Sequence, residues 1–191
     1  LAAYRRQFPD INVTVHDVIT ESVVEMVRAG RAELGVTFDP GDAQDLAFTP
    51  LFRDRFVAVL PAGHPLLQRD SLRWRDLARF PYITLQRPSS IRLLIDRMLQ
   101  ERALELVPTF EAHQLASIGR MVSAGLGTSV VPALSSSQME EMGAVCRAIS
   151  APVVTRQVGV ITRRRHPLSS AARAMTDVIA HWREASPAAP S

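Results

Sequence analysis

Short apolar runs alternate with amphipathic stretches along most of the 191-residue chain. Leu34 to Phe38 and Arg55 to Leu60 are runs of strand length, and Thr128 to Val131 is a third run, which ends at a proline. Between such runs the apolar positions recur at helical spacing, as they do from about Ser90 to Arg102. Strands that alternate with helices predict an α/β chain built on parallel strands.

The N-terminal part predicts a helix, a strand and a second helix in that order. Leu1 to Phe8 is a short amphipathic helix, and apolar residues alternate with polar ones from Ile11 to Val15 as in a half-buried strand. Ser22 stands three residues before Glu25, the spacing of a helix-capping box. A short helix from about Thr20 to Ala29 is therefore expected.

The same patterns predict the rest of the chain, and they are interrupted near Asp54 and near Arg156. At these two places we expect the chain to cross between two lobes. The remaining predicted elements are a short helix within Ser71 to Phe80, strands at Tyr82 to Leu85, Val107 to Phe110 and Val158 to Thr162, and helices at Gln114 to Ala124, at Ser135 to Met142 and from Ser169 onward.

Composition describes a globular chain that needs no covalent staple. Hydrophobic residues make up 47% and charged residues 21% of the sequence, and no apolar run approaches the ~20 residues that a membrane span requires. The single Cys146 can form no internal disulfide and has no companions at metal-ligand spacing, so we expect no metal or other cofactor. All 22 basic residues are Arg, and the net charge is only +3. The run from Arg163 to Arg165 could touch phosphate, but it is more typical of a solvated loop.

No catalytic motif stands out. The sequence contains no Gly-x-Ser-x-Gly, His-Glu-x-x-His or Walker pattern, and the acidic residues Asp39, Asp42 and Asp45 lie together only in a turn-rich loop. Gly125 and Gly127 end a helix and enter a strand, the opposite of a dinucleotide-binding turn. We therefore predict a binding protein and not an enzyme.

Several segments together resemble the effector-binding domain of LysR-type transcriptional regulators. The similarity spans about Leu1 to Trp182 and rests on the spacing of many weak motifs. The segments that carry it are Phe8 to Asp10, Val27 to Val36, Leu51 to Val59 and, most strongly, Met121 to Pro132 with its helix, Gly-x-Gly turn and strand.

The resemblance implies two Rossmann-like lobes, as in type II periplasmic binding proteins, joined by two crossover segments with a small effector in the cleft. Lobe I would comprise residues 1–54 and 157–182, lobe II residues 55–156, and residues 183–191 a disordered tail. In the family, lobe I opens with a further strand and a Ser/Thr-bearing loop just upstream of the position of Leu1, and the present sequence lacks both.

The resemblance also implies the partners. A cytoplasmic regulator of this kind binds a small, carboxylate-bearing effector, assembles as a homodimer or tetramer, and contacts DNA only through an N-terminal winged-helix domain that precedes the present sequence. It has no membrane partner. A periplasmic solute-binding protein of a transporter is the alternative, because it shares the fold. An upstream winged helix would identify the regulator, and a signal peptide the transporter component.

Candidate ligand contacts lie at the joints where strands lead into helices, because open α/β sheets bind ligands beyond the carboxyl ends of their strands. The resemblance places Thr20 at one such joint and Gln114 and Leu115, preceded by His113, at another. Ser89, Ser90 and Ile91 form a third joint, flanked by Arg87 and Arg92. Thr37, Phe38 and Val160 would line the floor of the cleft. Each hydroxyl could instead serve only as a helix cap, and each apolar residue could belong to the core.

Overall fold

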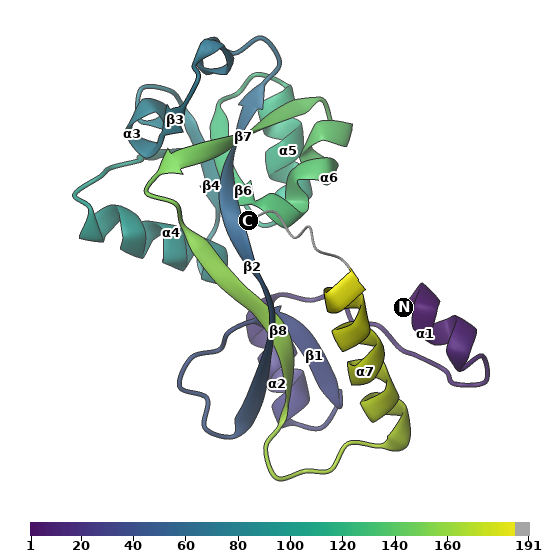
Figure 1. Ribbon diagram of the computed structural model, residues 1–191. Helices are drawn as coiled ribbons and strands as arrows, with labels where there is room; N and C mark the ends of the chain where they lie inside the picture. The colour runs from purple at the N-terminus through teal and green to yellow at the C-terminus, as the bar shows by residue number, and fades with distance from the viewer. Residues whose placement is uncertain (186–191) are drawn as a thin grey trace. The chain divides into compact units, whose positions relative to one another are not determined.

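The computed structural model describes residues 1–185, which form two compact α/β units (Figure 1). Unit 1 consists of Leu1–Arg53 with residues 156–185, and unit 2 of Asp54–Thr155. The chain passes between the units twice, within β2 (Leu46–Pro61) and at the start of β8 (Thr155–Arg163). Each crossing falls one residue before the position placed from the sequence.

Unit 1 is a small sheet with helices packed on it. Its elements are α1 (Ala2–Gln7), α2 (Thr20–Arg28), β1 (Leu34–Phe38), the first part of β2, nearly all of β8, and α7 (Ser170–Ala185). β1 pairs with β8 in antiparallel register from Leu34↔Thr162 to Phe38↔Val158. A Cβ atom on Gly35 would lie only 2.4 Å from the Val23 side chain, so glycine lets α2 approach β1 closely.

Two predictions in the N-terminal part are wrong. Residues 11–15 form no strand, and Val13 and Val15 are 45% and 61% exposed. A strand needs a hydrogen-bonded neighbour, and among the described residues β1 pairs with β8 and not with this segment. The capping box is also absent, because α2 begins at Thr20 with Ile19 as its N-cap, which leaves Ser22 inside the helix.

The predicted C-terminal tail also begins too early. α7 continues through residues 183–185, three residues that the prediction assigned to the disordered tail. Arg, Glu and Ala are all strong helix formers, and the first helix-breaking proline is Pro187. Residues 186–191 lie outside the described residues.

Unit 2 is built on three adjacent parallel strands. β4 (Tyr82–Leu85) pairs in parallel with β5 (Pro108–Ala112) on one side and with β6 (Thr128–Pro132) on the other. β2 runs antiparallel to both β6 and β7 (Ala144–Ala151), and the short β3 (Leu72–Arg73) pairs with β7. Hydrogen bonding follows the order β1-β8-β2-β6-β4-β5, since the two crossing strands are themselves neighbours.

Both faces of the unit 2 sheet are covered (Figure 1). α3 (Trp74–Leu77) and α4 (Ser90–Glu101) pack with Ala58 and Tyr82, whereas α5 (Leu115–Ser123) and α6 (Ser136–Glu141) pack with Val59 and Ile83. Burial on both faces explains why these strands read as continuous apolar runs. The 3-10 helices η1 (Pro65–Gln68) and η2 (Ala133–Ser135) complete the unit.

Candidate functional site

Two of the predicted joints leave the same edge of the unit 2 sheet. β4 and β5 are parallel neighbours that stay paired up to Leu85↔Ala112, and the backbone N–H of Gln86 donates to the carbonyl of Ala112 at 2.9 Å. α4 follows β4 after a short loop, and α5 follows β5 in the same way. The structure therefore brings together the two joints that hold Ser89, Ser90 and Ile91 and Gln114 and Leu115.

At the start of α4 the two serines have different surroundings. Ser89 is the N-cap, and its Oγ accepts the Arg92 backbone N–H at 3.5 Å. Ser90 is the first helical residue, is half-buried, and makes no hydrogen bond through its hydroxyl to any other described residue. Ile91 packs against both core clusters of unit 2, so its side chain serves the core while its backbone N–H lies at the open helix end.

Arg92 is buried and fully engaged, which the sequence did not reveal. Its Nε donates to Asp96 Oδ1 at 2.7 Å, and its Nη1 donates to Glu111 Oε1 and to the carbonyl of Leu85, both at 3.0 Å. Desolvation lowers the pKa of the Arg92 guanidinium, but the two carboxylates outweigh it and hold the pKa above its ordinary value. Arg87 also pairs with Asp96. Arg92 thus braces α4 against the strand ends and carries no unpaired charge.

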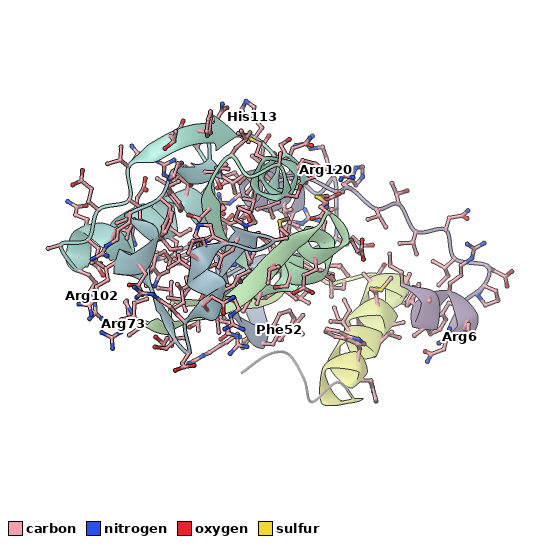
Figure 2. All side chains as sticks on the ribbon, turned by 90° about the horizontal axis from the view of Figure 1, so that it is seen from above. Arg6, Phe52, Arg73, Arg102, His113 and Arg120 are labelled. Atoms are coloured by element: carbon pink, nitrogen blue, oxygen red, sulfur yellow. The ribbon has the colours of Figure 1, made fainter. Side chains whose placement is uncertain are left out.

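The start of α5 has no side-chain cap. Gln114 occupies the N-cap position, is exposed, and makes no capping hydrogen bond. Leu115 packs against the core cluster that contains Ile118 and Val122. His113 is exposed at the end of β5 (Figure 2). The first N–H groups of α5 are therefore open, as an anion-binding helix start requires.

Thr20 and Thr37 are the polar candidates of unit 1. Thr20 is the first residue of α2, which also lacks a side-chain cap. Thr37 is 5% exposed, and its Oγ1 is buried without a hydrogen-bond partner among the described residues. It shares a strand face with Gly35, the face that packs on α2. A buried hydroxyl without a partner lowers the stability of the fold by about 1–3 kcal/mol, and a hydrogen bond from the Thr37 hydroxyl to a ligand or to water would remove this cost.

The apolar candidates of unit 1, Phe38 and Val160, both make packing contacts within the protein. The Arg156 guanidinium lies over the Phe38 ring, with its Cζ 3.0 Å from the ring centroid. Val160 is 4% exposed and pairs with Val36 in the β1–β8 ladder. A cation–π contact and core packing account for both side chains. Neither side chain offers a polar group to a ligand.

Polar groups at open helix starts on an α/β scaffold define a ligand-binding module. Among residues 1–185 no cluster of His, Cys, Asp and Glu could hold a metal ion. Within the same residues no helix is long and apolar enough to cross a membrane. Residues 1–183 match the family model described as the LysR substrate binding domain, and the chain belongs to this family.

The curated relatives of the chain are transcriptional regulators. The uncharacterized HTH-type transcriptional regulator YfeR of Shigella flexneri is 31% identical over 179 residues, which cover 94% of this chain and 58% of the relative. The transcriptional activator protein LysR of Escherichia coli is 31% identical over 153 residues, which cover 80% of this chain and 49% of that protein. The chain thus spans about half the length of these relatives.

Solved structures share the fold. The effector-binding domain of QuiR in complex with shikimate superposes with a TM-score of 0.86 at 22% identity and covers 96% of this chain and 88% of its own. The CcmR regulatory domain of Synechocystis in complex with 2-PG superposes with a TM-score of 0.88 at 18% identity, with 98% and 90% covered. The predicted α/β fold of the periplasmic-binding-protein type and the predicted resemblance are both confirmed.

Proposed function

We propose that this chain is the effector-sensing domain of a cytoplasmic LysR-type transcriptional regulator and that its ligand is a small carboxylate-bearing molecule. The observation that carries the proposal is the pair of adjacent helix starts in unit 2, where open N–H groups and the Ser90 hydroxyl lie at one sheet edge. Backbone N–H groups and a hydroxyl are suitable donors for a carboxylate.

Each unit offers candidate contacts of its own. In unit 2 the carboxylate is bound by Ser90 and the backbone N–H groups at the starts of α4 and α5, with Gln114 beside them. In unit 1 the candidate hydrogen-bonding groups are Thr20 and the Thr37 hydroxyl, which has no partner among the described residues. Ser89, Ile91, Leu115, Phe38 and Val160 shape the site through caps and packing, and donate nothing to the ligand from their side chains.

DNA binding and assembly belong to the longer protein that we propose. Its N-terminal winged helix would contact DNA, and the domain described above would change that contact when the effector binds. The names of the curated relatives support a regulator over a transporter component.

We further propose that the domain pairs as a homodimer, or as two such pairs in a tetramer, through the half-exposed apolar residues of α2, such as Val24 and Met26. A strict monomer in sedimentation at high protein concentration would contradict this pairing.

A thermal-shift screen with small organic acids tests the function. A ligand at 100 times its dissociation constant adds about 2.7 kcal/mol of stability, which raises the melting temperature by about 5–10 °C for a domain of this size. The contacts are then tested by calorimetry on Ser90→Ala, for which we expect a loss of about 1–2 kcal/mol in binding free energy. Thr20→Ala should weaken binding further in the double variant.

Two results would count against the proposal. Unchanged affinity in the Ser90→Ala/Thr20→Ala double variant, measured well below its melting temperature, would remove both residues from the site. Gln114 and the start of α5 would then be the next place to examine. If no organic acid stabilises the chain, while neutral ligands such as sugars do, the carboxylate class is wrong.

A further inference from the structure

Unit 1 contains an arginine-rich pocket that lies apart from the helix starts described above. It is formed by the turn that follows β8, the end of α2 and the loop before β2, and its volume is about 410 Å³. Its lining residues are Arg28, Gln44, Asp45, Arg163, Arg164, Arg165 and His166. All of these residues belong to unit 1.

Asp45 fixes the walls of this arginine pocket to one another. Its carboxylate accepts two hydrogen bonds from Arg28, from Nε at 2.6 Å and from Nη2 at 3.0 Å. Its backbone carbonyl accepts the N–H of Arg164 at 2.9 Å. The Arg164 guanidinium in turn donates to the carbonyl of Leu46 through Nε and Nη2, at 3.3 and 3.1 Å. The loop, the helix end and the turn are therefore held together before any ligand arrives.

Two backbone positions shape the pocket. Gly30 has φ +70°, and a Cβ atom there would lie 3.0 Å from Nη1 of Arg163, so glycine lets that guanidinium lie close to the chain. Arg165 has φ +66°, a left-handed conformation that is uncommon for a residue with a side chain. Such conformations occur where the surrounding structure holds them in place, and they are frequent at binding sites.

The pocket is not charge-balanced. Its four arginines face one aspartate, which leaves +3 when His166 is neutral, and the whole sequence also carries +3. Glu33 lies beside Arg163 in an adjoining hollow and lowers the local charge to +2, but its carboxylate accepts the N–H and Oγ of Ser169 at 2.8 Å each. Arg163 and Arg165 take part in no ion pair among residues 1–185.

We propose that this pocket is a second ligand site, which binds a small, multiply charged anion of the phosphate class. Guanidinium groups offer planar pairs of N–H donors that match phosphate oxygens, and three of the pocket's guanidinium groups, those of Arg163, Arg164 and Arg165, take part in no ion pair among the described residues. A concave, internally tied pocket suits a compact anion better than an extended DNA backbone. The sequence favoured a solvated loop for Arg163 to Arg165, and the contacts of Asp45 are what change that interpretation.

Titration of the 191-residue chain with inorganic pyrophosphate, at a fixed ionic strength of about 0.1 M, tests the proposal. The informative variant is Arg163→Gln/Arg165→Asn, because asparagine tolerates the left-handed backbone of residue 165. The matched control is Arg5→Gln/Arg6→Gln on α1, which removes the same charge from exposed positions outside the pocket; Figure 2 shows Arg6 on this helix. Melting curves establish that each variant is folded, and Arg165→Asn alone replaces the double variant if that one unfolds.

We expect pyrophosphate to bind the unmodified chain, and the pocket variant to bind it at least about tenfold more weakly, because one hydrogen bond between charged groups is worth about that factor. The α1 control should stay within about twofold. Equal weakening in both variants would show general charge attraction and overturn the site, as would the absence of binding at millimolar pyrophosphate. A third arm uses duplex DNA of arbitrary sequence. If the unmodified chain binds DNA but not pyrophosphate, and the pocket variant loses DNA binding, the pocket binds the phosphates of DNA and the small-anion proposal is wrong.

Discussion

The starts of α4 and α2 were both predicted as joints between a strand and a helix, but only α4 follows a strand, and the two helix starts are built in opposite ways. At α4 the Ser89 side chain caps the helix, and Arg92 ties it to Asp96, Glu111 and the end of β4. At α2 the N-cap is the exposed Ile19, and no side chain caps the helix. Nearby on β1, the buried Thr37 hydroxyl has no partner among the described residues.

This difference separates stability from binding. A joint whose polar groups are already satisfied within the protein adds to stability and holds its neighbours in place. A joint with open N–H groups and a partnerless hydroxyl contributes less to the stability of the free protein, and it has more to gain from a ligand. We therefore expect substitutions of Ser89 and Arg92, the cap and the brace of α4, to act mainly on unfolding, and substitutions at the start of α2 to act mainly on effector affinity.

Removal of the Arg92 brace should have the largest effect. Arg92→Ala leaves Glu111 and the carbonyl of Leu85 without this donor and leaves Asp96 with Arg87 alone, and breaking a buried ion pair costs about 3–5 kcal/mol. We expect a loss of about 3 kcal/mol in the free energy of unfolding, near the lower limit, because Glu111 is 45% exposed. Urea unfolding measures the loss. Arg97→Ala, at an exposed position of α4, is the matched control and should change stability by less than about 0.5 kcal/mol. If Arg92→Ala lowers the free energy of unfolding by less than about 1 kcal/mol, the contacts of Arg92 do not stabilise the fold.

Thr37→Val tests the open side of the comparison and should stabilise the free protein. The substitution replaces a buried hydroxyl without a partner by a methyl group, which should add about 1–2 kcal/mol to the free energy of unfolding. Effector affinity should fall at the same time if the hydroxyl contacts the ligand.

Ser129→Ala is the control for Thr37→Val, because the buried Ser129 Oγ donates to the carbonyl of Ile83 at 2.7 Å, and its loss should destabilise the fold. A drop in stability for Thr37→Val as well would show that water already satisfies Thr37 in the free protein.

Ser89→Ala separates a cap from a ligand contact. Loss of the N-cap should lower the free energy of unfolding by about 1 kcal/mol and leave effector affinity unchanged. Ser90→Ala should do the reverse. Urea unfolding gives the free energy of unfolding of each variant, and calorimetry gives its effector affinity. If Ser89→Ala also weakens binding while Ser90→Ala does not, the roles of the two serines are exchanged.

The sequence predicted where these helices begin but not how their ends are satisfied. Periodicity placed the starts near Thr20 and Ser90, and both helices begin at those residues. The partners of Arg92 were out of reach, because Glu111 and the Leu85 carbonyl come from two strands that only the tertiary fold brings beside α4. Local pattern reports which face of an element is buried. It does not report which polar group lies opposite.

The strands show the same limit. The doubly buried strands of unit 2 were predicted because both of their faces are apolar. β7 was missed, since its small and polar residues alternate with few large apolar ones and much of it is exposed. The strand expected at residues 11–15 has the right alternation, but pairing depends on a neighbour that the pattern cannot supply.

Installing a cap at α2 should convert the open joint into a satisfied one, with the smallest effect on stability. Ile19 is 59% exposed and its backbone is extended (φ −66°, ψ 157°), a conformation that an N-cap serine adopts without strain. Ile19→Ser should therefore raise the free energy of unfolding by about 0.5–1 kcal/mol in the absence of ligand. The new hydroxyl would accept from an N–H group at the open start of α2, beside the proposed contact Thr20, so affinity should fall if that N–H group also binds the effector, although the protein is more stable. Ile19→Ala is the matched control, because it removes the same side chain without adding a cap. If Ile19→Ser stabilises the chain and leaves affinity equal to that of Ile19→Ala, the capped N–H group of α2 does not contact the ligand, and the Thr20 and Thr37 hydroxyls are the candidates that remain in unit 1.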